Sequence, residues 1–118
     1  MKRHLRIAFL LFLTASSTAW AFWPDYDGAQ FPKAYFHEGF ACEHGSWNRA
    51  RRVGYKVIRI PMNGSQATGE YEDFLTGFVT KEGNVWGRPV GVTVAGDGAL
   101  MVTDDGSGTI WRVAYKGK

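Results

Sequence analysis

The stretch from Gly87 to Val113, GRPVGVTVAGDGALMVTDDGSGTIWRV, decides the fold. With the residues just after it, it contains three short apolar runs, at 90–94, 99–103 and 109–115. Turn residues separate these runs, because glycine accepts positive φ angles and Asp side chains cap turn amides. The stretch therefore predicts an antiparallel three-stranded meander, which cannot close a hydrophobic core alone.

The chain before this stretch predicts more short strands and no long helix. We expect strands at 40–43 and 55–61, a polar turn at 62–69, and a further apolar stretch at 71–79. Residues 22–39 are aromatic but interrupted by prolines, which predicts an irregular lead-in. The expected fold class is therefore all-β.

Residues 1–21 have the pattern of a signal peptide. A basic start is followed by an apolar run of about signal-peptide length, and an Ala-x-Ala pattern ends at Ala21. We therefore expect export, to the periplasm or out of the cell. The alternative is an uncleaved anchor, although the apolar run is shorter than the ~20 residues of a spanning helix.

Charge and cysteine content exclude several classes of protein. Three of the 14 Lys and Arg residues lie in the leader, so 11 basic residues remain against 11 acidic ones. This balance gives no general electrostatic reason to bind nucleic acid or, beyond export, a membrane. The single cysteine, Cys42, excludes an internal disulfide and is expected to be a buried small hydrophobe rather than a reactive thiol.

A weak internal repeat relates the two halves of the chain. The pattern Arg-(Ile/Val)-x-x-x-Gly occurs at 59–64 and again at 112–117, an offset of 53 residues, whereas the turn glycines Gly45 and Gly106 are offset by 61. The first unit would then carry eight extra residues in its loop. A period in the fifties is typical of propeller blades, and chance similarity between glycine-rich strands is the alternative.

In a meander, alternate turns lie on the same side, because every turn reverses the chain. The loop at 44–54, the segment before Val90 and the turn at 104–108 should therefore share one rim. This rim would gather most candidate site residues of the chain: His44, Asn48, Arg49, Arg51, Arg52, Arg88, Asp104 and Asp105. We expect Asp104 and Asp105 to cap the turn backbone, and Arg51 and Arg52 to form a solvated loop tip.

The predicted strands amount to roughly one and a half blades, whereas closed propellers use four to eight. Six motifs carry a resemblance to a known family: FPKAY at 31–35, EHGSWNR at 43–49, GYKV at 54–57, EDFLTGF at 72–78, WGRPVGV at 86–92, and DDG followed by IWR within 104–112. In this order and spacing, residues 31–115 resemble the C-terminal end of the sorbosone dehydrogenase family. These proteins are relatives of soluble glucose dehydrogenase that use pyrroloquinoline quinone (PQQ).

The resemblance implies a six-bladed propeller in the periplasm, with PQQ and calcium on its top face, that oxidises an aldose or aldehyde sugar. Arg88 matches the position of a cofactor-contacting arginine. The segment from His44 to Arg49 matches the region of a cofactor-contacting lysine, with His44, Asn48 and Arg49 as the candidates here. The family's catalytic histidine and calcium ligands come from earlier blades, so neither role is assigned to this chain.

Two functional hypotheses follow. In the first, residues 40–118 form the C-terminal blades of a PQQ-dependent sugar or aldehyde dehydrogenase and are not active alone. In the second, the chain is a small exported β-module that binds a sugar or a protein partner without catalysis. Unpaired strand edges would favour either a chain that supplies the missing blades or self-association.

Overall fold

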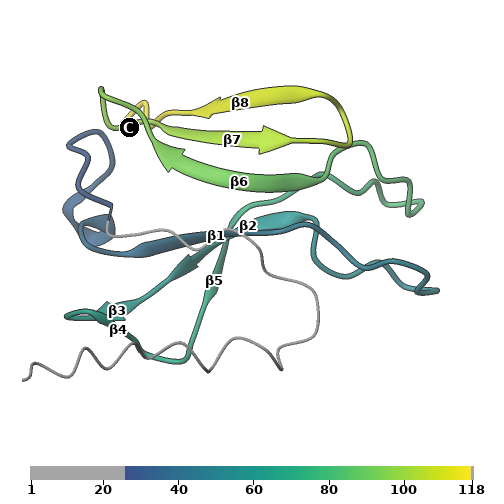
Figure 1. Ribbon diagram of the computed structural model, residues 1–118, viewed down its shortest axis with the longest axis horizontal. Helices are drawn as coiled ribbons and strands as arrows, with labels where there is room; N and C mark the ends of the chain where they lie inside the picture. The colour runs from purple at the N-terminus through teal and green to yellow at the C-terminus, as the bar shows by residue number, and fades with distance from the viewer. Residues whose placement is uncertain (1–25, 118) are drawn as a thin grey trace, which may run out of the picture.

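Two three-stranded antiparallel sheets and one small hairpin make up residues 26–117, the part of the chain that the computed structural model describes (Figure 1). The first sheet has the order β1-β2-β5 and the second the order β6-β7-β8. Their strands are β1 (Gly39–Glu43), β2 (Lys56–Ile60), β5 (Glu72–Leu75), β6 (Pro89–Val94), β7 (Leu100–Asp104) and β8 (Thr109–Val113). The hairpin pairs β3 (Met62–Asn63) with β4 (Gln66–Ala67).

The all-β prediction is confirmed, with small differences at the ends of strands. The apolar stretch at 71–79 forms a strand only over β5, and Gly77 follows with a φ of 105°. The last strand ends at Val113 rather than at Tyr115. The segment predicted as a polar turn, 62–69, contains the two short strands of the β3–β4 hairpin, which the sequence did not predict. The signal peptide predicted at 1–21 lies outside the described residues.

The register of the two sheets confirms the internal repeat. Phe40 pairs with Arg59 across β1 and β2, and Met101 pairs with Arg112 across β7 and β8. These pairs are related by offsets of 61 and 53 residues, and the same two offsets relate all five pairs of each ladder. His44, which follows β1, and Asp105, which follows β7, therefore occupy equivalent positions in the two units.

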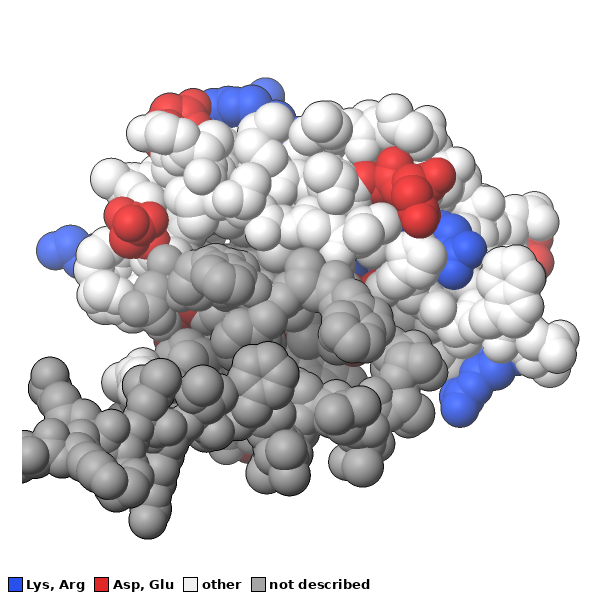
Figure 2. All heavy atoms as spheres, viewed as in Figure 1, with Lys and Arg blue, Asp and Glu red and all other residues white. Residues whose placement is uncertain are grey.

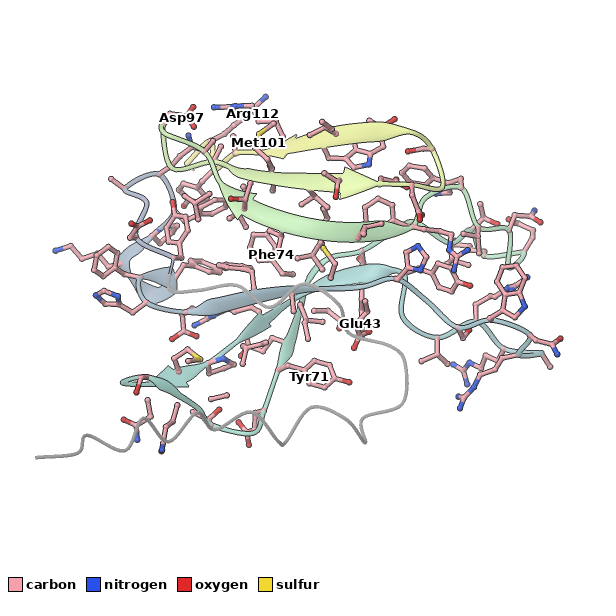
Figure 3. The ribbon with its side chains drawn as sticks, viewed as in Figure 1. Glu43, Tyr71, Phe74, Asp97, Met101 and Arg112 are labelled. Carbon is pink, nitrogen blue, oxygen red and sulfur yellow. The ribbon has the colours of Figure 1, made fainter. Side chains whose placement is uncertain are left out.

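The hydrophobic core lies between the two sheets, where β1 runs beside β6 (Figure 1). Its buried members are Tyr26, Phe40, Cys42, Val57, Leu100 and Val102. Phe74, labelled in Figure 3, points from β5 into this layer and meets the ring of Phe40 edge to face at 4.8 Å. Cys42 is 1% exposed, and burial raises the pKa of its thiol to about 12, which confirms the prediction of a buried hydrophobe.

The described part of the lead-in contains a 3₁₀ turn, η1 (Lys33–Tyr35), and is anchored to both sheets. The hydroxyl of Tyr26 donates a hydrogen bond to the carbonyl oxygen of Gly98 at 2.6 Å and accepts one from the amide of Phe31 at 3.0 Å. Arg59 of β2 donates to the carbonyl oxygen of Ala34 at 3.0 Å. No helix within residues 26–117 is long and apolar enough to cross a membrane.

Candidate functional site: an arginine on the loop rim

Three loops meet at one end of the sheets, as the alternation of turns predicts: the β1–β2 loop, the segment before β6 and the β7–β8 turn (Figure 1). One nitrogen of Arg88, Nη2, lies 3.2 Å from Nδ1 of His44. The other ring nitrogen of His44, Nε2, lies 2.8 Å from Oδ1 of Asp105. The amide of Asp105 also donates to the carbonyl oxygen of Arg88 at 3.2 Å. One residue from each loop thus joins a chain from Arg88 through His44 to Asp105.

This chain of contacts assigns the tautomer of His44. A guanidinium can only donate hydrogen bonds, so Nδ1 of His44 must be the acceptor. Nε2 therefore carries the ring proton, and this N–H donates a hydrogen bond to Oδ1 of Asp105. A proton on Nδ1 would place two donors against each other and break the contact with Arg88. His44 thus acts here by orienting Arg88.

The guanidinium of Arg88 lies between two aromatic rings. It is 5.6 Å from the ring centre of Trp47 and 5.9 Å from that of Tyr55, both within cation–π range. Tyr55 is buried, whereas Trp47 is 81% exposed. Within residues 26–117, Nε of Arg88 is buried without a hydrogen-bond partner. The rim therefore holds an oriented cation beside an open aromatic face, and one donor of that cation is buried and unused.

The β1–β2 loop has a hydrogen-bonded neck. The amide of Ser46 donates to the carbonyl oxygen of Val53 at 2.8 Å, and the amide of Val53 donates to Oγ of Ser46 at 3.1 Å. The hydroxyl of Tyr55 donates to the carbonyl oxygen of Ser46. At Gly45, with a φ of 110°, an added Cβ would lie 2.4 Å from the Tyr55 ring. This neck fixes where the loop projects.

The structure separates the four residues proposed to contact a cofactor. His44 and Arg88 are brought together, whereas Asn48 and Arg49 lie on the exposed tip of the loop. Asn48 has a φ of 57°, a left-handed conformation that reverses the chain there. Within the described part of the chain, neither Asn48 nor Arg49 has a hydrogen-bond or ion-pair partner. Their cofactor roles stay predictions.

Asp104 caps the turn, as the sequence predicts. Its Oδ1 accepts hydrogen bonds from the amides of Arg88 at 2.7 Å, Gly106 at 2.9 Å and Ser107 at 3.1 Å. Its Oδ2 accepts one from Nε1 of Trp111 at 3.0 Å. Burial alone would raise the pKa of this carboxyl, but the donors from Arg88, Trp111 and Ser107 outweigh it and lower the pKa to about 2. Asp104 thus holds the backbone of Arg88 in place.

A separate open groove of about 330 Å³ lies between the end of the first sheet and β8. Its lining includes Phe78, Trp86 and Trp111. The rings of Trp86 and Trp111 meet edge to face at 5.8 Å, so Trp111 packs against the ring of Trp86. Trp86 remains 46% exposed at the groove. Among residues 26–117, no three His, Cys, Asp or Glu side chains gather as a metal site.

The model of the TrAA12-like family matches residues 16–116. The chain belongs to the TrAA12-like family. An uncharacterized protein of Borreliella burgdorferi strain B31 is 40% identical over 92 residues, which span 77% of this chain and 24% of that protein. This chain therefore spans about a quarter of the length of the curated relative that it matches.

Two solved structures are similar to the TrAA12-like chain. The PQQ domain of pyranose dehydrogenase from Coprinopsis cinerea, in its holo form, is 27% identical with a TM-score of 0.55, over 73% of this chain and 25% of that one. The family AA12 enzyme of Trichoderma reesei, in an iodide structure, is 24% identical with a TM-score of 0.52, over 62% of this chain and 20% of that one. At this identity the similarity shows a shared fold alone. The family match and the similarity to the domain from Coprinopsis cinerea support a relationship to PQQ-dependent dehydrogenases. The sorbosone or glucose specificity stays a prediction.

Sequence reasoning did not identify Tyr55 as part of the site. It was assigned to a strand and to the GYKV motif without a role in the site, but it carries a φ of 59°, supports Ser46 and covers one side of Arg88. The one local signal is the Gly54-Tyr55 pair at the end of the loop. Asp105 was assigned to the rim and to turn capping, but its contact with His44 spans 61 residues and has no local signature.

Proposed function

We propose that this chain contributes part of the cofactor-facing rim of a PQQ-dependent oxidoreductase that acts on a sugar or aldehyde. The observation that carries the proposal is the oriented guanidinium of Arg88, held by His44 and flanked by the rings of Trp47 and Tyr55. The similar domain from Coprinopsis cinerea is named for PQQ, and the chain belongs to the TrAA12-like family, which supports the proposal.

The residues of the rim fit the chemistry of PQQ. PQQ is planar and carries three carboxylates, so a site for it needs cations and flat surfaces. Arg88 would pair with a carboxylate, and the open face of Trp47 would stack on the ring system. Asn48 and Arg49, on the adjacent tip, would reach a further carboxylate. Calcium enters this proposal only through the resemblance. When bound, PQQ supplies the quinone that accepts electrons from the sugar.

Titration of the chain with PQQ, with and without calcium, tests the proposal through tryptophan fluorescence. We expect saturable quenching, because Trp47 lies beside Arg88. Arg88→Gln should weaken PQQ binding at least about tenfold, which corresponds to the free energy of one charge-assisted hydrogen bond. The matched control is Arg112→Gln, since Arg112 is exposed and pairs with Asp97 at the opposite end of the sheet (Figure 3).

Three outcomes contradict the proposal. The first is that PQQ shows no saturable binding, and the second is that Arg88→Gln and Arg112→Gln weaken its binding equally. The third outcome is a circular dichroism spectrum that shows loss of the fold in Arg88→Gln but not in Arg112→Gln, since Arg88 would then act on the fold. Dye reduction with aldoses and aldehydes is measured in parallel. We expect no turnover by the chain alone, because no residue of the rim is assigned as the catalytic base. The proposal includes export directed by residues 1–21, which cell fractionation tests.

The groove beside β8 supports the second candidate, a module that binds sugar without catalysis. Exposed indole rings such as that of Trp86 offer a flat apolar face on which a sugar ring can stack. Sugar binding that needs no PQQ and is lost in Trp86→Ala, but not in Trp47→Ala, would favour this function over the first.

A further inference from the structure

The tip of the β1–β2 loop, residues 47–52, carries more exposed charge than the proposed cofactor contacts of Trp47, Asn48 and Arg49 would use; we call it the arginine loop. It carries Arg49, Arg51 and Arg52, all exposed. Within residues 26–117, none of these three guanidiniums has an ion-pair or hydrogen-bond partner. From His44 to Tyr55 the chain contains no acidic residue. The loop thus concentrates three unpaired positive charges.

Exposed apolar groups accompany these charges. Trp47 is 81% exposed at the start of the loop, and Val53 is 52% exposed at its end. The neck of hydrogen bonds between Ser46 and Val53 holds both ends together, so the charges and apolar groups are presented on one projecting turn. In Figure 1 this loop extends beyond the ends of the strands.

The equal numbers of basic and acidic residues in 22–118 hide this local charge. Several carboxylates elsewhere are paired with cations of the sheets, as Asp97 is with Arg112 and Asp73 with Lys56. Figure 2 shows acidic and basic atoms in small separate groups over the visible face. At physiological salt, exposed charges more than about 8 Å apart are largely screened. A surface that approaches the arginine loop therefore meets its local charge rather than the sum over the chain.

We propose that the arginine loop is a docking surface for a membrane that contains anionic phospholipid. Guanidiniums pair with lipid phosphates, and tryptophan favours the interface between headgroups and acyl chains. The exposed side chains of Trp47 and Val53 favour a lipid surface over a soluble polyanion, which would leave both in water. This differs from the expectation of no membrane contact beyond export, which rests on the overall charge.

A fluorescent label on the loop tests the proposal. Ala50→Cys places a thiol at the exposed tip, and Ser65→Cys places one on the exposed turn between β3 and β4, at the other end of the molecule. Cys42 is 1% exposed and will not take the label. Each protein is labelled with an environment-sensitive dye and mixed with phosphatidylcholine vesicles that contain either no phosphatidylglycerol or about one third of it. The label separates contact by the loop from contact by residues 1–21.

We expect a blue shift of the dye in the Ala50→Cys protein that needs phosphatidylglycerol and falls with salt, and no shift in the Ser65→Cys protein. Replacing all three arginines by glutamine should weaken binding about a hundredfold, from about fivefold per charge. Arg112→Gln is the matched control and should leave it unchanged. No shift of the loop label, equal shifts of both labels, or a shift of the loop label with heparin but not with vesicles would each overturn the proposal.

Discussion

Asp104 offers the sharpest test of how the rim is built. Its Oδ1 accepts three backbone amides, and its Oδ2 accepts the indole N–H of Trp111. In Asp104→Asn, the amide oxygen can keep the three backbone donors, but the amide nitrogen then faces the Trp111 donor. One charge-assisted hydrogen bond is lost and three are weakened, which should cost about 3 kcal/mol of the free energy of unfolding.

The pKa of Asp104 adds a pH dependence with a definite sign. The folded state lowers this pKa from 3.8 to about 2, so the carboxylate stabilises the fold fully above pH ~4. This contribution, about 2 kcal/mol, is lost as the pH falls from about 4 to about 2. The stability gap between the wild-type chain and Asp104→Asn should therefore shrink over the same pH range.

Urea unfolding followed by tryptophan fluorescence, at pH 6 and at pH 2.5, measures both effects. Asp105→Asn is the matched control, because the Asp105 side chain is 59% exposed and, within residues 26–117, its one hydrogen-bond partner is His44. The substitution should change stability by less than about 0.5 kcal/mol. The reasoning is refuted if Asp104→Asn is as mild as Asp105→Asn, or if the gap is independent of pH.

Three further predictions concern the loop neck, the lead-in and the core. Gly45→Ala should cost about 3 kcal/mol because the new Cβ meets the Tyr55 ring, whereas Gly64→Ala, at an open turn with a φ of 60°, should cost about 1 kcal/mol in the same urea assay. Tyr26→Phe should cost about 2 kcal/mol, because the Tyr26 hydroxyl makes hydrogen bonds with Gly98, Gln30 and Phe31. The control, Tyr35→Phe, should change stability by less than about 0.5 kcal/mol. Equal effects of the two substitutions would contradict the anchoring role of Tyr26. Cys42 should resist a thiol-specific dye at pH 8 until urea unfolds the chain. The exposed thiol introduced by Ala50→Cys should react at once. Prompt reaction of Cys42 in the native protein would show that the core opens.

The site could be predicted in part, because its loops follow from strand order. Once β1, β6 and β7 are assigned, alternation of turns brings His44, Arg88 and Asp105 to one rim without any further information. The partners within the rim could not be predicted, since they depend on side-chain geometry. Arg49 and Arg88 are both arginines in predicted rim segments, and the sequence does not distinguish them. The structure places Arg88 against two aromatic rings and leaves Arg49 exposed to solvent.

The sequence by itself determined the all-β class, the approximate positions of the strands in the two three-stranded sheets, and the repeat with its eight-residue loop insertion, because alternating apolar residues and turn glycines act locally. Only the tertiary structure decided how the lead-in docks and what His44 does. The hydroxyl of Tyr26 reaches Gly98, 72 residues away, and His44 reaches Arg88, 44 residues away. Such contacts depend on how the two sheets pack, and packing between distant segments leaves no periodic signal in the chain.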